Sequence, residues 1–191
     1  DSSSDIAPQE SNSDDTSSPT DTTSDKISKT KLTGTYKVPL KNIYVDVPSY
    51  KEHYKELEKG YTELFIIHDS RYVSFTSARL SKANSSKEAH KVAFEEMIPN
   101  MQNYEGGING INITKDEETT INGIDMYLFE GTINYGTDTK FDGYAKGCAF
   151  VLDGIPCEIV GSVIDKSQSQ ALIDEISNIV DEMTQTVRSE K

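Results

Sequence analysis

Hydrophobic and polar residues begin to alternate only after residue 31, and this alternation predicts β-strands. Two successive stretches within residues 36–47 would each place apolar side chains on one face of a strand. Pro39 interrupts the first stretch and favours an edge strand or a bulge, because proline cannot donate a ladder hydrogen bond. The apolar positions are Tyr36, Val38 and Leu40, followed by Ile43, Val45 and Val47.

The pattern at residues 49–60, SYKEHYKELEKG, predicts a short helix. Ser49 and Glu52 have the Ser-x-x-Glu spacing of a capping box, in which both side chains bond free amides at a helix start. Gly60 suits the helix end because glycine readily adopts a left-handed conformation. The buried face of this helix would consist of Tyr50, Tyr54 and Leu57.

Residues 63–78 predict a hairpin that turns at Asp69 and Ser70. Both faces of this hairpin are apolar, so we expect the sheet to be covered on both sides. Pairing across the turn would place Leu64, Ile66, Val73 and Phe75 on one face and Phe65, Ile67 and Tyr72 on the other.

The residues that follow predict a longer helix. Ser85 and Glu88 repeat the capping-box spacing, and Pro99 should end or kink the helix because it lacks the backbone donor. Apolar side chains recur at helical intervals, at Ala89, Val92, Ala93, Met97 and Met101.

The second half of the chain predicts four antiparallel strands that form a meander. Asn122-Gly123 and Asp153-Gly154 suit tight type I′ hairpin turns, because these residue types tolerate positive φ. A loop over residues 136–140 would join the two hairpins.

Residues 167–187 carry the clearest helical pattern of the chain. Ser167 and Gln170 give a third capping box, and one apolar stripe lies opposite acidic residues and glutamine. One helix would then cover each face of the sheet, which predicts an α+β fold: an antiparallel β-sheet flanked by helices in an α/β/α sandwich. The apolar stripe consists of Leu172, Ile173, Ile176, Ile179, Val180, Met183 and Val187.

The beginning of the chain has a composition that disfavours folding. Residues 1–25 contain seven acidic residues and no basic residue, so more than half of the net charge of −13 lies there. With almost no side chain to bury, this segment cannot offset the ~1–2 kcal/mol per residue lost on ordering the backbone. We therefore predict a flexible acidic spacer over residues 1–31 and a single domain over residues 32–191.

Charge and hydropathy exclude two classes of protein. The sequence has no cluster of Lys and Arg that would bind nucleic acid, since KTK at residues 29–31 is too short. No run approaches the roughly 20 apolar residues of a membrane helix, and no signal peptide is present. This pattern is typical of a mature chain whose targeting segment has been removed, although a cytosolic protein would show the same absence.

The spacer favours the first of these two interpretations. An anionic segment that extends by charge repulsion makes sense beside a fixed anchor. It resembles the segment that follows the lipid-modified cysteine in surface lipoproteins of Gram-positive bacteria. That resemblance implies a lipid anchor upstream of Asp1, a removed signal peptide and a location on the extracellular face of the cytoplasmic membrane.

The chain resembles the PsbP-like fold in the order of its predicted elements. The resemblance also rests on the stretch INGIDMYLFEG before a second strand pair and on the terminal ISNIVDEMTQTV helix. This fold is shared by photosystem extrinsic proteins, the Ran-binding Mog family and many bacterial lipoproteins. The resemblance covers about Thr35 to Val187 and implies an adaptor or accessory subunit rather than an enzyme. Many bacterial members place a tryptophan shortly after the first proline, whereas this chain has no tryptophan.

The search for catalytic and metal-binding motifs finds little. None of His53, His68 and His90 belongs to a His-x-x-x-His or His-Glu-x-x-His pair, so each is interpreted as a solvated or satisfied polar residue. The stretch HDSR at residues 68–71 contains the residue types of a hydrolase triad. Adjacent residues of a tight turn cannot align as nucleophile, base and orienting group, so it is interpreted as a turn.

Two further stretches lack the spacing that binding would need. KDEE at residues 115–118 has no calcium-loop spacing, and EGGINGI at residues 105–111 follows a helix, whereas phosphate loops precede one. Carboxylates are abundant, but the sequence does not pair two of them across a cleft. We therefore expect no catalytic residue, no metal site and no cofactor.

Cys148 and Cys157 lie on the two strands of the second hairpin. If Leu152 pairs with Ile155, Cys148 lies opposite Ile159 and diagonal to Cys157, near the ~7 Å upper limit of Cα separation for a disulfide. A register shift would bring the cysteines opposite each other or onto different faces. We expect two buried thiols rather than a bridge.

These observations predict a non-catalytic, membrane-tethered extracytoplasmic domain that binds a protein or a cell-envelope component. The alternative is a carrier or chaperone that holds a small apolar ligand or hydrophobic peptide in a groove between sheet and helix, lined by some of the ten tyrosines. A third hypothesis, a hydrolase using Asp and Glu, would need two convergent carboxylates with opposed pKa shifts.

Overall fold

The computed structural model describes residues 32–48, 51–57, 59–68, 70–101, 108–135, 141–164 and 169–190. The predicted spacer over residues 1–31 lies outside these residues, as do Ser49, Tyr50, Asp69, Ser167 and the loop over residues 136–140.

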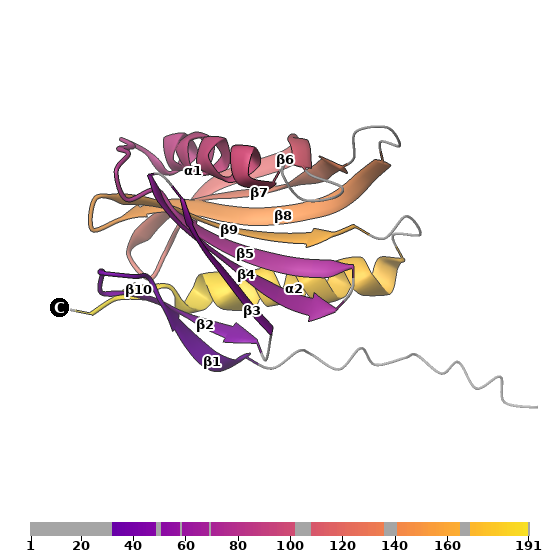
Figure 1. The fold of residues 1–191 in the computed structure, drawn as a ribbon, viewed down its shortest axis with the longest axis horizontal. Coiled ribbons are helices and arrows are strands. Elements are labelled where there is room, and N and C mark those ends of the chain that lie inside the picture. The colour runs from indigo at the N-terminus through magenta and orange to yellow at the C-terminus, as the bar shows by residue number, and fades with distance from the viewer. Residues whose placement is uncertain are drawn as a thin grey trace, which may run out of the picture.

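The described chain forms two antiparallel sheets and two helices (Figure 1). In the large sheet the strand order is β3-β4-β5-β9-β8-β7-β6, and in the small sheet it is β1-β2-β10. The large sheet contains β3 (Lys51–Leu57), β4 (Gly60–His68), β5 (Arg71–Ser77), β6 (Ile108–Ile121), β7 (Ile124–Tyr135), β8 (Phe141–Leu152) and β9 (Ile155–Val163). The remaining elements are β1 (Leu32–Lys37), β2 (Ile43–Pro48), β10 (Arg188–Ser189), α1 (Ser86–Met101) and α2 (Gln170–Thr186).

The helices lie on opposite faces of the large sheet, as expected for an α/β/α sandwich. Val160 of β9 packs with Phe129 beneath α1, where the Phe129 ring lies 4.4 Å from that of His90. The next residue, Gly161, points the other way, toward Ile176 and Val180 of α2. The prediction of an α+β sandwich is therefore confirmed, with the small sheet lying beside α2 on the same face (Figure 1).

The main hydrophobic core lies between the large sheet, α2 and the small sheet. It contains the predicted stripe of α2 and the predicted apolar positions of β1 and β2 except Leu40. Its largest fully buried apolar side chains are Phe65, Phe75, Phe150, Ile43, Met126, Ile159, Ile176, Ile179 and Met183.

The two glycine-containing hairpin turns form as predicted. Asn122 and Gly123 have φ values of 52° and 76°, and Asp153 and Gly154 have values of 50° and 74°. Positive φ at both central positions gives the backbone twist that matches the flanking strands. The meander β6-β7-β8-β9 follows from these turns.

The helix predicted over residues 49–60 is wrong, because residues 51–57 form strand β3. This strand pairs in antiparallel register with β4, from Lys51 opposite Ile66 to Leu57 opposite Gly60. Pairing with a neighbouring strand overrides a weak helical preference. Gly60 has a role other than helix termination, since a Cβ there would overlap the carbonyl oxygen of Ser77.

β4 and β5 pair as an antiparallel hairpin, as predicted, but its faces differ from the prediction. A register shift between Ile66 and His68 places Ile66 opposite Tyr72 and Phe65 opposite Val73. Phe65 and Val73 therefore share the buried face with Phe75. The physical reason is a β-bulge, which adds one residue to a strand and reverses the facing of every residue beyond it.

Leu40 was predicted to lie on the core face of a strand, and the structure places it in a turn instead. The amide of Val38 donates to the Ile43 carbonyl at 2.9 Å, so β1 and β2 form a hairpin. Leu40 has a φ of 60° and is 77% exposed. A left-handed conformation costs an L-residue roughly 1–2 kcal/mol, and this exposed side chain gains no packing in return.

Replacing Leu40 by asparagine is therefore expected to stabilise the protein by up to about 1 kcal/mol. Asparagine tolerates the left-handed conformation, and the exposed leucine contributes no buried area. The free energy of unfolding from urea titration tests this expectation. Lower stability of L40N than of the wild type would show that Leu40 makes a folded-state contact that this structure lacks.

The helix starts follow the predicted capping boxes only in part. At α1 the Ser85 side chain accepts the Glu88 amide at 3.1 Å, and Glu88 accepts the Asn84 amide at 2.6 Å. This helix ends at Met101, two residues after Pro99. The third capping box is wrong, because α2 begins at Gln170 itself, after Ser169, whose side chain makes no capping bond.

Candidate functional site

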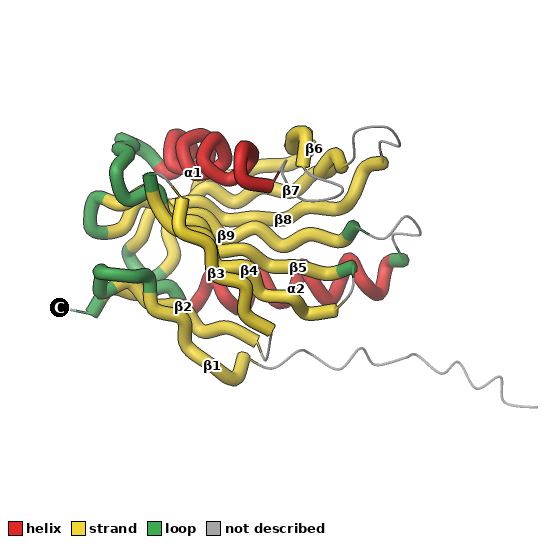
Figure 2. Tube along the Cα trace, viewed as in Figure 1, coloured by secondary structure: helices red, strands yellow, loops and turns green. Residues whose placement is uncertain are grey.

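Several turns of the sandwich, among them those between β1 and β2 and between β8 and β9, lie at the end of the molecule where the described chain finishes (Figure 2). Ala78, just after β5, donates its amide to Pro156 of β9 at 2.9 Å. Ser189 of β10 donates to Asp153 in the β8–β9 turn at 2.5 Å. We define the turn end as residues 38–42, 78–81, 122–123, 152–154 and 185–190.

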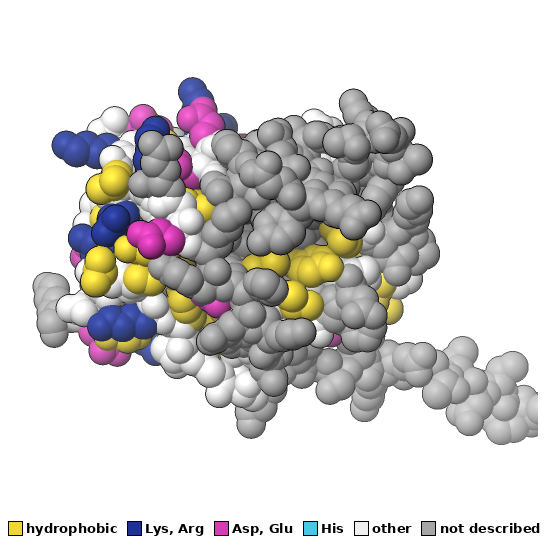
Figure 3. Space-filling view, in the orientation of Figure 1, with side chains coloured by type: hydrophobic (Ala, Val, Ile, Leu, Met, Phe, Trp, Pro, Cys, Tyr) yellow, Lys and Arg dark blue, Asp and Glu magenta, His cyan; other side chains and the backbone are white. Residues whose placement is uncertain are grey.

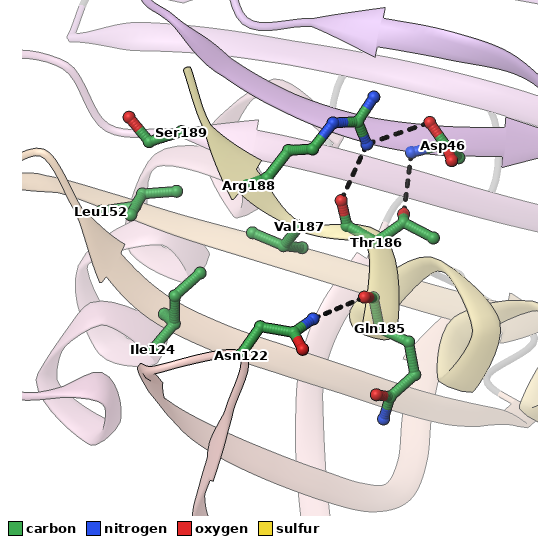
Figure 4. A pocket seen from close by; sticks show the side chains of 9 residues that line it. All are labelled: Asp46, Asn122, Ile124, Leu152, Gln185, Thr186, Val187, Arg188 and Ser189. Carbon is green, nitrogen blue, oxygen red and sulfur yellow. Dashed lines mark hydrogen bonds and ion pairs between the residues drawn. The ribbon is translucent and has the colours of Figure 1, made fainter. Parts of the chain in front are cut away.

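A groove of about 500 Å³ opens at the turn end (Figure 4). Its residues come from β2, the two hairpin turns with the strand ends beside them, the end of α2 and the segment that follows α2. Its apolar side chains are those of Ile124, Leu152 and Val187, and the remaining lining residues are polar. These polar residues are Asp46, Asn122, Gln185, Thr186, Arg188 and Ser189.

Hydrogen bonds to the end of α2 hold the polar side of the groove in place (Figure 4). Arg188 donates to the Thr186 carbonyl at 2.9 Å and to Asp46 at 3.1 Å. Asn122 donates to the Gln185 carbonyl at 2.7 Å, and the Asp46 amide donates to the Thr186 hydroxyl at 2.8 Å. The last carbonyls of a helix lack intrahelical partners, so these donors satisfy groups that would otherwise be free.

The groove is therefore suited to binding more than to catalysis. Its one cation, Arg188, and its one anion, Asp46, are paired with each other. Both side chains are partly exposed, and together with the amides and hydroxyls of the rim they offer donors and acceptors above an apolar floor. Such a mixture of convergent polar groups and apolar surface is characteristic of ligand and partner sites.

Two exposed leucines lie at the turn end, outside the groove lining. Leu40 is 77% exposed and Leu80 is 65% exposed, and these are the large hydrophobic side chains that stand out on the described surface. Figure 3 shows hydrophobic and basic side chains exposed together at this end of the molecule. Sequence reasoning missed this surface because it assigned Leu40 to the core and made no prediction for Leu80.

The structure describes the side chain of one of the three histidines, His90. His53 and His68 belong to β3 and β4, and their side chains lie outside the described residues. His90 on α1 contacts the buried Glu158 of β9 through Nδ1. It is therefore a polar residue with a hydrogen-bond partner, as interpreted from the sequence. Burial raises the pKa of the Glu158 carboxyl, and the hydrogen bond from His90 only partly offsets that rise.

The sequence stretches that were considered for chemistry have structural roles in the described chain. Arg71 from the HDSR stretch forms an ion pair with Glu175 of α2, so it ties the helix to β5. Asp116 of the KDEE stretch pairs with Lys87 at 3.4 Å, and Lys115 pairs with Glu130 at 3.7 Å. Among the described residues, no group of three or more His, Cys, Asp or Glu side chains is arranged to hold a metal ion.

One cluster has residue types that sequence reasoning did not consider. Lys146 of β8 donates to the Ser177 hydroxyl at 2.9 Å and to the Asp181 carboxylate at 2.8 Å. Tyr144 donates to Glu130 at 2.7 Å, and burial raises the pKa of its phenol. A serine nucleophile needs a lysine that accepts its proton, whereas this lysine is held as a donor by a carboxylate. The cluster therefore fastens α2 to β8.

The cysteines follow the predicted register. Leu152 lies opposite Ile155, which places Cys148 opposite Ile159 and Phe150 opposite Cys157. Both cysteines are buried, free thiols, as predicted. Burial raises the pKa of Cys148 to about 12 and raises that of Cys157 further, so neither thiol ionises near neutral pH.

We therefore expect neither cysteine to react with a thiol reagent in the folded protein at pH 8. Both should react once the chain is unfolded in guanidinium, since unfolding restores an ordinary pKa and access. Thiol titration with and without denaturant, with intact mass measured without reductant, checks this. A mass lower by two protons, or rapid native labelling, would contradict the buried-thiol structure.

Comparisons with known proteins identify the fold. No family model matches this sequence, and no curated protein matches it significantly. The solution structure of the cyanobacterial PsbP protein CyanoP from Synechocystis has a TM-score of 0.52 at 11% identity, over 82% of this chain and 91% of that protein. A Bacteroides thetaiotaomicron structure (TM-score 0.44, 13% identity, 84% of this chain and 50% of that one) is less similar.

A protein of unknown function from Pseudomonas aeruginosa is also less similar, with a TM-score of 0.38 at 13% identity over 78% of this chain and 92% of that protein. At these identities the comparisons bear on the fold alone. No described helix is long and apolar enough to cross a membrane. The resemblance drawn from the order of elements is confirmed by the comparison with CyanoP: this chain has the PsbP-like fold.

Proposed function

We propose that this chain is a non-catalytic binding module that acts on the outer side of the cytoplasmic membrane, tethered through a lipid anchor upstream of Asp1. In this proposal the turn end contacts a protein or a cell-envelope component. The anionic composition of residues 1–25 supports the tether. The observation that carries the binding role is the combination of a groove and two exposed leucines at one end of the sandwich.

Large exposed apolar side chains at the same end of a molecule as a groove favour an interaction surface at that end. Leu40 combines exposure with a strained backbone, a pairing that folding alone does not favour. The polar groups of the groove are already held in position by bonds to the end of α2. Binding there would therefore require little reorganisation, which lowers the entropic cost of association.

The packing of the core disfavours the alternative of an apolar-ligand carrier. The space between the large sheet and α2 is filled by side chains with almost no exposure, among them Phe75, Phe150, Ile159, Ile176 and Met183. An apolar ligand between sheet and helix would have to displace these side chains. Close-packed interiors resist such displacement.

A quantitative capture experiment tests the binding role. The full chain, the double variant Leu40→Asn with Leu80→Asn, and a control variant Ala171→Asn are each immobilised and incubated with envelope fractions. Ala171 is exposed near the start of α2, at the opposite end of that helix from Gln185, which lines the groove. We expect the same protein or polymer to be enriched on the wild type and the control and lost from the double variant.

Equal enrichment on all three proteins would contradict the proposed surface, because leucine exposure would then be irrelevant to binding. The tether is tested separately, in cells that produce the whole gene product. We expect labelled palmitate to be incorporated and protease added to intact cells to degrade the domain. A protein that is protected from protease and carries no label would contradict the tether without bearing on the binding surface.

A further inference from the structure

Glu158 is the most deeply buried charged residue among those that the structure describes. It projects from β9, the middle strand of the large sheet, and its side chain is 1% exposed. Oε2 contacts Nδ1 of His90, whereas Oε1 accepts no hydrogen bond from any residue that the structure describes. Burying a carboxylate with one oxygen unpaired is costly unless a neighbouring group supplies charge or a proton.

His90 is the neighbouring group that can supply a proton or a positive charge to Glu158. The imidazole belongs to α1, is 14% exposed and is fixed among three aromatic rings. Its ring centre lies 4.4 Å from that of Phe129, and 5.7 Å from those of Tyr127 and Phe94. These contacts hold Nδ1 toward Glu158, so the pair joins α1 directly to the centre of the sheet.

The other described contacts of α1 with the sheet include Phe94, which packs against Ile133 and Ala145. The fully buried residues on the described face of α1 are the small side chains of Ala89 and Ala93, with Ser86 near the helix start. Its described ion pairs, Lys87 with Asp116 and Lys59 with Glu96, each involve at least one well-exposed partner. Exposed ion pairs contribute little to stability. Among the described contacts of α1, the His90–Glu158 pair is the one that links the helix to a buried carboxylate on the middle strand.

The groups around the pair disfavour a bare negative charge on Glu158. From β7, Tyr127 faces the pair, and burial together with a hydrogen bond to Asp116 raises its pKa to about 12, so it stays neutral. From β6, Asp116 and Glu118 lie near Tyr127, and from α1, Lys87 pairs with Asp116. The cross-strand neighbours of Glu158 are the uncharged Thr76 of β5 and Ala149 of β8.

We propose that His90 and Glu158 form a pH-sensitive latch in which one shared proton holds α1 on the sheet, and loss of that proton loosens the helix. The direction of the pH dependence follows from the buried carboxyl of Glu158. Its pKa in the folded protein is raised above the unfolded value, mainly by burial. Stability from such a group is fully present below the unfolded pKa and is lost as pH rises through the folded pKa. The helix is therefore held more tightly in acid and released as pH rises.

Release of α1 would uncover an apolar surface. Tyr127, Phe129 and Val160 form a cluster beneath this helix and are almost fully buried. The latch therefore couples the surrounding pH to the exposure of a hydrophobic sheet face. It does not depend on the turn end, since Glu158 and His90 lie outside the groove lining.

Hydrogen–deuterium exchange of the full chain tests the latch. Protection factors, corrected for the intrinsic pH dependence of exchange, are measured for peptides of α1 between pH 5.5 and 8.5. In the wild type we expect the protection of α1 to fall by at least about tenfold in total, because one proton links pH to docking. In Glu158→Gln the same peptides should show a flat profile.

The control variant is Asp116→Asn, which removes a nearby exposed carboxylate but keeps the latch, and its profile should match the wild type. A flat wild-type profile, or an equal slope in the Glu158→Gln variant, would overturn the proposal. Glu158→Leu provides the same comparison if the glutamine variant does not fold.

His90→Phe supplies an independent test, because it keeps an aromatic ring in the stack and removes the donor to Glu158. We expect α1 in this variant to be poorly protected at the alkaline end of the range and to recover protection at the acidic end, because burial raises the pKa of the Glu158 carboxyl and lets it hold its own proton. Loss of protection that is equal at both ends of the range would show a packing defect only and would overturn the latch.

Discussion

Replacing Phe75 by alanine is expected to lower the free energy of unfolding by about 3–5 kcal/mol, the largest loss that we predict for a single residue. The Phe75 side chain is fully buried where β5, the small sheet and the centre of the large sheet meet. Its ring lies 5.5 Å from that of Tyr36 and 6.2 Å from that of Phe150. Removing it leaves a cavity that the neighbouring Tyr36 and Phe150 rings cannot fill without moving.

Urea denaturation followed by circular dichroism measures this loss. Leu80→Ala serves as the control, because that side chain is mostly exposed and its truncation should change stability by no more than about 0.5 kcal/mol. Similar losses for the two variants would mean that Phe75 does not lie in the core described here.

Adding one methyl group at Gly161 is expected to destabilise the protein by about 1–3 kcal/mol. A Cβ at this position would lie 2.5 Å from Cγ2 of Val180 and 2.7 Å from Cγ2 of Ile176, both on α2. β-Branched side chains in a helix have little rotamer freedom, so α2 would have to move away from β9. The cost arises in the folded state and should appear as faster unfolding.

The matched control is the same substitution at Gly110 of β6, where an added Cβ meets no atom within 4 Å. Gly110→Ala should leave stability unchanged or slightly raised, because alanine restricts the unfolded chain. Comparable unfolding rates for Gly161→Ala and Gly110→Ala would contradict the close packing of α2 on the sheet.

The parts of the fold that the sequence predicts correctly depend on local signals. The Asn122-Gly123 and Asp153-Gly154 turns fix hairpin registers, which is why the positions of Cys148 and Cys157 could be predicted relative to each other. The apolar stripe of α2 is long and regular enough to define a buried face without knowledge of its neighbours. These elements suffice to predict the sandwich.

The errors occur where distant segments decide the outcome. Residues 51–57 become a strand because they pair with β4, and a bulge near Ile66 reverses the faces of that hairpin. Neither effect leaves a clear trace in local periodicity. Leu40 has the spacing of a core residue, but the turn between β1 and β2 begins before it.

The candidate site could not be predicted from the sequence either, because its residues come from segments that are far apart in the chain. The groove combines Asp46, Asn122 and Arg188 from segments far apart in the chain. His90 and Glu158 are separated by 68 positions and meet only because α1 lies over the middle strand. A glutamate in the apolar run CEIV was the one available signal, since a charged residue in a buried strand requires a partner.

Site-specific photo-crosslinking in intact producing cells tests the binding role most directly. A photoreactive phenylalanine derivative is placed at Leu80 in the turn end or at Ala171 near the opposite end of α2, both exposed positions. We expect irradiation to give one discrete adduct from position 80 and none from position 171. Adducts of the same size from both positions, or none from position 80, would contradict a binding surface at the turn end.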